Sequence, residues 1–248
     1  MPITFSHPAA VVPLLGVGLV PSALVIGSIT PDLPYYLPGP LTSARTHAVS
    51  GIVTFDLALG LLAFLVWHVL LAPTAVALAP AALRERLAPG LPVPVREHLA
   101  RWWVVLVSLV IGAATHVVWD SFSHPGRWGT NRIAWLREEH GPVMGYTWVQ
   151  YGSGALGFVV LALVVGHWWL RTPRTAGRQR VPAFDRRVVL ICVVVVLVSG
   201  VIGAVAGLAT ADENLFAVLF RMLTWGCGAA GAGWLAFAVV ARSKLTGS

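Results

Sequence analysis

Residues 102–124 read WWVVLVSLVIGAATHVVWDSFSH. The first part of this stretch is apolar enough for a membrane interior, yet the stretch goes on to His116, Asp120 and His124. A spacing of four residues, repeated, places all three side chains near one stripe of a helix. Ionisable groups in a membrane segment are costly, and they usually face a protein interior or a water-filled cavity. The stretch therefore predicts a membrane helix with a functional polar stripe. The alternative is that His116 and Asp120 only pair with each other to fill a buried polar contact.

The whole chain has the composition of an integral membrane protein. Its 248 residues are 57% hydrophobic and 11% charged, whereas a soluble domain usually carries about 25% charged residues. The net charge of +7 comes from Arg near the apolar runs, which indicates anchoring and topology rather than nucleic-acid binding. We therefore expect membrane lipids, and no nucleic acid, as partners. Cys192 and Cys227 lie inside apolar runs and make no case for a disulfide or a thiolate metal site.

The apolar runs predict an all-α, polytopic membrane helical bundle with about five transmembrane helices and an N-terminal broken or re-entrant segment. About 20 residues suffice to cross a bilayer, and we expect spans at about 48–72, 100–122, 146–170, 188–210 and 215–240. Residues 9–29 are apolar, but Pro13 and Pro21 interrupt them, which favours a broken or re-entrant helix pair. The four prolines of residues 30–43 predict a stiff loop, and residues 73–98 read as an interfacial connection.

We expect these elements to form a single membrane domain, residues 1–248. Residues 1–170 would form its core, residues 171–187 a basic linker, and residues 188–248 a two-helix C-terminal hairpin. Small residues such as Gly203 and Gly207 would allow the hairpin helices to pack closely.

Loop charges predict the orientation in the membrane. The linker 171–187 holds six Arg and one Asp, whereas the turn 211–214 holds no Lys or Arg. Basic loops stay in the cytoplasm, so the linker is expected inside and the turn outside. Counting back along the spans places the loop after Asp120, and the Pro-rich loop, outside. The chain thus reads as a multi-pass protein of the plasma membrane, with its polar cluster on the extracytoplasmic side.

Histidines and carboxylates gather at that outer side. Asp32 lies in the Pro-rich loop, His47 at the head of the first span, and His116 and Asp120 near the outer end of the second. Imidazole and carboxylate are ligands for zinc and similar metals, and helical bundles draw such ligands from several helices. The pattern predicts a site for a divalent metal, zinc first among the candidates.

Three further residues have two interpretations each. His124 precedes a proline, so it either ligates the metal or ends its helix. Asp56, about 13 Å further along the helix than His47, is either a ligand or a carboxylate that orients another ligand. If residues 9–29 cross the membrane once, His7 lies on the inner side. If they form a re-entrant pair, His7 lies on the outer side with the other residues.

Several stretches together resemble a known family: FSHPAAVVPL, SALVIGSITPDLPYY, THAVSG, THVVWDSFSHPG and VQYGSGALG. They resemble a bacterial membrane-protein family, domain-of-unknown-function family 4184, over about residues 1–170. That family is distantly similar to membrane-bound metal-dependent hydrolases and to the zinc-dependent phospholipase C fold. The resemblance implies metal ligands in the order His7, Asp32, His47, His116 and Asp120. The chain lacks the later His-x-x-x-Glu pair of the phospholipases.

These observations lead to a functional hypothesis, metal-dependent hydrolysis at the outer membrane face. A bound ion would polarise a phosphoryl or carbonyl oxygen and lower the pKa of a bound water. Asp56, Asp120 or a glutamate of the outer loop could accept the proton of that water. The position suggests an amphiphilic phosphoester or lipid-linked substrate, and Arg45, Arg127 and Arg132 are available to hold a phosphate or to anchor the protein at the interface. The alternatives are a transporter or metal-binding carrier, and a non-catalytic assembly protein with a buried polar network.

Thiol labelling tests the orientation. A cysteine introduced at Thr175 should resist an impermeant thiol reagent in intact cells, because its linker is basic and hence cytoplasmic. A cysteine at Asn214 should react. The reverse pattern would overturn the orientation, and the outer-face hypothesis with it.

Overall fold

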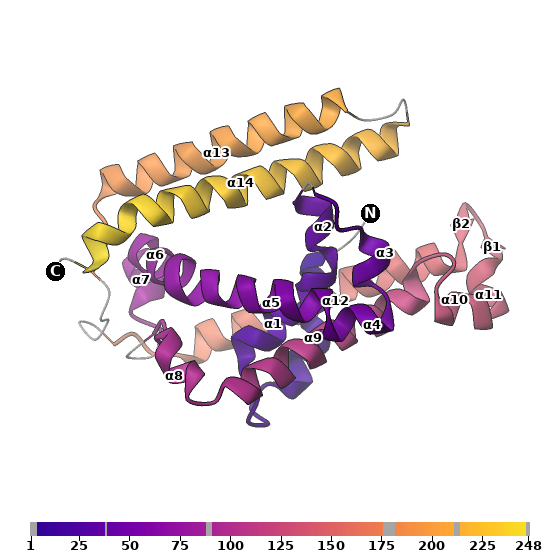
Figure 1. The fold of residues 1–248 in the computed structure, drawn as a ribbon, viewed down its shortest axis with the longest axis horizontal. Coiled ribbons are helices and arrows are strands. Elements are labelled where there is room, and N and C mark those ends of the chain that lie inside the picture. The colour runs from indigo at the N-terminus through magenta and orange to yellow at the C-terminus, as the bar shows by residue number, and fades with distance from the viewer. Residues whose placement is uncertain (1–3, 38, 88–90, 176–181, 211–213, 247–248) are drawn as a thin grey trace. The chain divides into compact units, whose positions relative to one another are not determined.

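The protein is almost entirely helical (Figure 1). The computed structural model describes residues 4–37, 39–87, 91–175, 182–210 and 214–246. Up to the first predicted span, its elements are η1 (Thr4–Leu14), α1 (Pro21–Ile29), η2 (Thr30–Asp32), α2 (Leu33–Tyr36) and α3 (Ser43–Thr46). The next are α4 (Val49–Val53), α5 (Phe55–Val66), the π-helical turn η3 (Trp67–Leu71), α6 (Ala72–Leu78), α7 (Ala81–Arg84) and α8 (Val95–Leu99). The rest are α9 (Trp102–Ser123), α10 (Trp128–Arg132), α11 (Ala134–Arg137), the antiparallel strands β1 (Glu139–His140) and β2 (Val143–Met144), α12 (Gly145–Arg171), α13 (Arg186–Ala209) and α14 (Leu215–Thr246).

Five helical stretches are long and apolar enough to cross a membrane, which confirms the all-α, multi-pass prediction. They are Val49–Leu78, Trp102–Ser123, Gly145–Arg171, Arg186–Ala209 and Leu215–Arg242. The first of them joins α4, α5, η3 and α6, with a break at Thr54, whose φ and ψ are −115° and −87°. It runs to Leu78, so the expectation of a connection from residue 73 was wrong by six residues, because α6 continues the helix beyond the π-helical turn.

The Pro-rich stretch 30–43 is more helical than expected. It contains the short helical turns η2 and α2 and the start of α3. Pro31 lies at the start of η2, and Pro34 lies in the first turn of α2. Proline is tolerated in a first helical turn, because the N–H that it lacks has no partner within the helix there. The prolines therefore limit these helices to single turns without excluding them.

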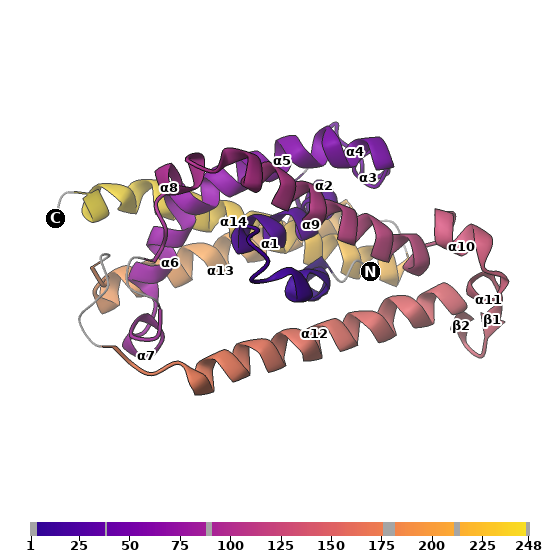
Figure 2. The same ribbon diagram turned by 90° about the horizontal axis from the view of Figure 1, so that it is seen from below.

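The described residues fall into two compact units. One comprises Met1–Leu33, Leu41–Phe64 and Arg101–Arg171, and the other Pro34–Pro40, Leu65–Ala100 and Thr172–Ser248. In the second unit α13 and α14 run antiparallel, side by side (Figures 1 and 2). Gly203 lets them approach, since a Cβ there would lie 2.4 Å from the carbonyl oxygen of Trp225. Residues 176–181 of the predicted linker and 211–213 of the predicted turn lie outside the described residues.

The N-terminal apolar segment turns back on itself within the first unit. Helices η1 and α1 pack against each other, and the turn between them contains Gly16 and Gly18 with φ of 95° and 85°, a left-handed conformation that glycine adopts readily. The two ends of the segment meet where the hydroxyl of Thr4 donates a hydrogen bond to Oδ2 of Asp32. The segment thus turns back as a re-entrant pair and does not cross once from end to end. His7 and Asp32 therefore lie at the same end of it.

Helix α1 packs directly on the backbone of α9 through two glycines. A Cβ on Gly27 would lie 2.3 Å from the carbonyl oxygen of Leu109, and a Cβ on Gly112 would lie 2.3 Å from that of Leu24. The start of α1 is also fixed on α9, because the N–H of Val20 donates to Oγ of Ser108 at 2.9 Å. This contact sets the depth of α1 against the polar stripe of α9.

Substitution of Gly112 tests this contact. Gly112→Ala places a methyl group against the backbone of α1, so it should destabilise the protein by roughly 1–3 kcal/mol, as overpacking of a tight interior does. Gly152→Ala in α12 is the matched control, since a Cβ there meets nothing within 4 Å. Thermal unfolding in detergent should show a lower midpoint for Gly112→Ala than for the control. Equal midpoints would show that α1 does not pack this closely.

Candidate metal centre

Two histidines from different elements are held in the same tautomer by backbone carbonyls. Nδ1 of His116 lies 2.7 Å from the carbonyl oxygen of Ser28, and Nδ1 of His47 lies 2.9 Å from that of Ser43. A carbonyl oxygen only accepts hydrogen bonds, so each Nδ1 carries the proton. In the neutral ring Nε2 then presents a lone pair. Each histidine is therefore oriented for Nε2 ligation, in the way that outer partners orient metal-bound imidazoles.

The two Nε2 atoms converge with two carboxylate oxygens. His47 Nε2 lies 3.3 Å from His116 Nε2, 3.4 Å from Asp32 Oδ1 and 3.2 Å from Asp120 Oδ2. His116 Nε2 lies 3.5 Å from both of these oxygens. One ligand atom from each residue lies within 4.8 Å of the others, and all four residues are buried. Four ligands at 2.0–2.1 Å from a tetrahedral ion would be separated by about 3.3–3.4 Å.

Hydrogen bonds among these four side chains do not account for their arrangement. Two ionised carboxylates and two neutral Nε2 atoms are all hydrogen-bond acceptors. If both rings were protonated, two N–H groups would face each other across 3.3 Å. At most one Nε2 proton fits between the two rings, and one N–H is too few for the three acceptor atoms that face it. A single cation at the centre satisfies all four atoms at once, and Asp32 Oδ1 otherwise has no hydrogen-bond partner among the described residues.

Comparison of the whole chain with models of known protein families identifies one family. The model of one family, a domain of unknown function called DUF4184, matches residues 1–240. The chain belongs to this family. The match extends past the residues that carry the resemblance in sequence and includes both units. No curated protein and no solved structure matches the chain.

In this DUF4184 protein two further histidines contact the other oxygen of Asp120. Oδ1 of Asp120 lies 3.4 Å from Nε2 of His7 and 3.3 Å from Nδ1 of His124. His7 also stacks on His116, with ring centroids 3.8 Å apart. The structure thus brings both predicted residues to the centre, on the far side of the Asp120 carboxylate from the group of four. His124 also follows the last residue of α9, so it ends its helix as well.

A repeated tetrapeptide marks these two histidines in the sequence. Phe-Ser-His-Pro occurs at residues 5–8 and again at 122–125. The first copy lies in η1, and the second lies at the end of α9. Because both histidines face one oxygen atom of Asp120, this repeat is a signal by which they can be paired from the sequence alone.

Asp56 is not part of this group. Its side chain is buried in α5, and neither carboxylate oxygen has a hydrogen-bond partner among the described residues. Asp56 was predicted to belong to this site only from its expected depth in the membrane. Its role as a ligand, orienting group or proton acceptor stays a prediction.

Burial and neighbouring charges set the ionisation of the groups outside the spans. Burial and the charge of His116 lower the pKa of His7 to about 3, so its ring is neutral near pH 7. Burial opposes ionisation of Asp32, but when His116 and His47 are protonated, their Nε2 atoms, 3.5 and 3.4 Å from Oδ1, hold its pKa below the usual range. For His47 burial acts against protonation, yet the hydrogen bonds to Asp120 and Asp32 outweigh it and raise the pKa. A metal ion bound here would therefore compete with a proton at His47.

Several supporting groups were not foreseen from the sequence. Thr4 donates to the second oxygen of Asp32, Ser123 donates to Oδ1 of Asp120 at 3.3 Å, and Nε2 of Gln150 lies 2.9 Å from Nε2 of His124. The carbonyls that orient His47 and His116 belong to residues 43 and 28. Every residue has a carbonyl, so no residue type could have indicated them.

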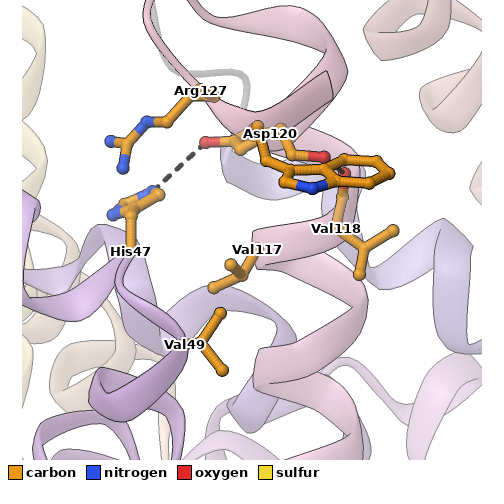
Figure 3. Close-up of a pocket in the computed structure, with 8 residues that line it drawn as sticks. His47, Val49, Val117, Val118, Asp120 and Arg127 are labelled. Atoms are coloured by element: carbon orange, nitrogen blue, oxygen red, sulfur yellow. Dashed lines mark hydrogen bonds and ion pairs between the residues drawn. The ribbon is translucent and has the colours of Figure 1, made fainter. Parts of the chain in front are cut away.

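A cavity of about 300 Å³ opens beside the centre (Figure 3). His47 and Asp120 contribute to its lining, so two of the four converging side chains are accessible from it. The cavity lies where α9 ends and α4 begins. A small molecule in it would reach the candidate metal centre from the end of the membrane spans.

Metal analysis tests the centre. The purified protein should carry about one or two transition-metal ions per chain, with zinc first among the candidates, because His and carboxylate donors suit it. The double variant His116→Leu, Asp120→Leu should still insert in the membrane but lose this metal. Asp32→Asn and His47→Ala should lose it too, although they lie far away in sequence. The exposed His167, replaced by Ala, is the control.

The same measurement separates a metal site from a merely polar core. If His116 and Asp120 only satisfy each other, removing both is near neutral and metal content does not change. Size-exclusion chromatography of each variant shows whether it is folded. A folded double variant with the metal content of the wild type would mean that α9 supplies no ligand.

Proposed function

We propose that this protein is a metal-dependent hydrolase that acts at the outer face of the membrane. The observation that carries the proposal is the convergence of four buried acceptor atoms, from Asp32, His47, His116 and Asp120, beside a cavity. Such an arrangement is costly unless a cation occupies it. We infer that these four residues hold a divalent ion.

The residues around such an ion suit ester hydrolysis. When bound, the ion would polarise an ester oxygen and lower the pKa of a water molecule. Asp32 and Asp120 supply two negative charges, which balance a divalent ion. The two neutral histidines add no negative charge, so the bound ion would remain electrophilic. Burial of all four residues strengthens these electrostatic effects.

His7 is positioned to accept a proton. Its Nε2 faces Oδ1 of Asp120, and its buried Nδ1 has no hydrogen-bond partner among the described residues. When Nε2 donates to Asp120, Nδ1 of the neutral ring carries a lone pair. The carboxylate orients the ring as it does in other carboxylate–histidine pairs. Asp120 would thus serve as ligand through one oxygen and as a support for His7 through the other.

His124 provides a route from the centre to the surface. It contacts Oδ1 of Asp120 and the side chain of Gln150, and its side chain is 27% exposed. A proton passed to Asp120 or His7 would therefore reach solvent at the end of α9. The loop charges favour the extracytoplasmic side for this end, and we propose that orientation for the site.

A hydrolysis assay tests the proposal. Zinc-loaded protein should hydrolyse bis(4-nitrophenyl) phosphate or 4-nitrophenyl acetate, and a chelator should abolish this activity. Asp32→Asn should lose both metal and activity. His7→Asn should keep the metal but lower the rate by about 10²–10⁴-fold, the usual contribution of a general base. His167→Asn is the control for loss of an exposed histidine.

The outcomes separate the three classes of function. Metal-loaded protein that hydrolyses neither ester would favour a carrier. Protein that binds no metal would favour an assembly protein with a buried polar network. A rate for His7→Asn equal to that of the wild type would remove His7 from the mechanism and leave the metal centre in place.

A further inference from the structure

The cavity beside the candidate metal centre combines one cation with an apolar wall. Its polar side is formed by His47, Asp120 and the side chain of Arg127 (Figure 3). Val49 and Val118 contribute to the wall, and they are 81% and 59% exposed. Both valines belong to helical stretches that are long and apolar enough to span the membrane, close to the ends of those stretches. The cavity therefore faces both a charged centre and the region of lipid chains.

Arg127 differs from the other two arginines that were candidates for binding a phosphate. The guanidinium of Arg45 lies 6.0 Å from the ring of Phe55, and that of Arg132 lies 4.9 Å over the ring of Trp128. Neither of these arginines lines the cavity. Arg127 lines it, is half-buried, and forms no ion pair with the described residues. Its charge is thus available to a ligand.

The backbone fixes Arg127 in this place. The chain leaves α9 through a turn in which Gly126 has φ of 71°, and the N–H of Arg127 then donates to Oγ1 of Thr130 at 3.0 Å. Thr130 in turn donates to the carbonyl of His124 at 2.9 Å. These bonds tie the base of the Arg127 side chain to the end of the helix that carries Asp120.

The charge balance around the cavity selects an anionic substrate. Asp32 and Asp120 neutralise a divalent ion, so the charge of Arg127 is left for the ligand. A carboxyl ester is neutral at its reacting group, whereas a phosphodiester keeps a negative charge there. Arginine binds phosphate oxygens through charge-assisted, often bidentate, hydrogen bonds. The apolar wall then suits a hydrocarbon chain on one ester oxygen.

We propose that Arg127 and this cavity bind a phosphoester that carries a hydrocarbon chain, and that this amphiphile is the substrate class of the site. The inference rests on the proposed hydrolase function. In the reaction the water oxygen bonds to phosphorus, the bond from phosphorus to one ester oxygen breaks, and a water proton goes to the departing alkoxide. From a phosphodiester the products are an alcohol and a phosphomonoester, and from a phosphomonoester they are an alcohol and inorganic phosphate. Arg127 is a binding residue for the phosphate.

Native mass spectrometry in a non-ionic detergent tests the proposal, since it counts bound zinc and bound ligand in the same spectrum. The probes are dodecyl phosphate, ethyl phosphate, inorganic phosphate and dodecanol. Dodecyl phosphate should bind about tenfold or more tightly than each of the others, because only it offers both the charge and the chain. Arg127→Gln should weaken its binding by about tenfold or more, the effect of a lost hydrogen bond to a charged group, with zinc content unchanged. Arg132→Gln, which removes the same charge from the other end of α10, the short helix that Arg127 precedes, should bind within about twofold of the wild type.

Three results would overturn this proposal. Equal binding by Arg127→Gln and the wild type would show that Arg127 does not hold the phosphate. Equal affinity for ethyl, inorganic and dodecyl phosphate would assign the site to free phosphate, and equal affinity for dodecanol would leave only a lipid-chain groove. The comparison of wild-type affinities decides the matter even if Arg127→Gln does not fold.

Repeating the titration on chelated protein separates this proposal from the hydrolase proposal. Binding of dodecyl phosphate that depends on Arg127 but persists without metal would support the substrate class. A lack of metal or of hydrolysis in the same preparation would contradict only the proposed function.

Discussion

Two imidazole nitrogens that face each other at 3.3 Å, with carboxylate oxygens beside both, form the constraint on which the rest of the first unit depends. The carbonyls of Ser28 and Ser43 hold the Nδ1 protons on the far sides of the rings. Acceptor atoms therefore gather at one point in a buried environment. Burying unpaired polar atoms costs free energy of the order of several kcal/mol, so the arrangement is expected to persist only if a ligand compensates for it.

The surrounding helices bring the residues of this group together. The re-entrant pair η1 and α1 brings His7 and Asp32 back to the same end, and the glycine contacts between α1 and α9 place the carbonyl of Ser28 beside His116. The end of α3 supplies His47 just before the first span begins. The four ligands thus come from three segments of one compact unit: Asp32 from η2, His47 from the end of α3, and both His116 and Asp120 from α9. No pair of neighbouring helices alone would hold the ion, which explains why a short motif such as His-x-x-x-Asp is weak evidence by itself.

Much of this architecture was predictable because membrane spans follow from length and hydropathy alone. The four residues that converge were also predictable, since each is an ionisable group near the same ends of the spans. What the sequence did not reveal depends on the path of the backbone. The choice between a span and a re-entrant pair for residues 9–29 is decided by a turn at Gly16 and Gly18 and by packing on α9. Likewise the division of the Asp120 carboxylate between two sets of histidines requires coordinates.

X-ray absorption spectroscopy at the zinc edge of the zinc-loaded protein tests the central claim most directly. The structure predicts about four nitrogen and oxygen ligands at about 2.0–2.1 Å, with the outer-shell scattering of two imidazole rings and no sulfur. A His47→Ala, His116→Leu protein should retain no zinc after gel filtration and so give no zinc-edge signal. A spectrum without imidazole scattering in the wild type, or a wild-type protein that retains no zinc after gel filtration, would contradict the assignment.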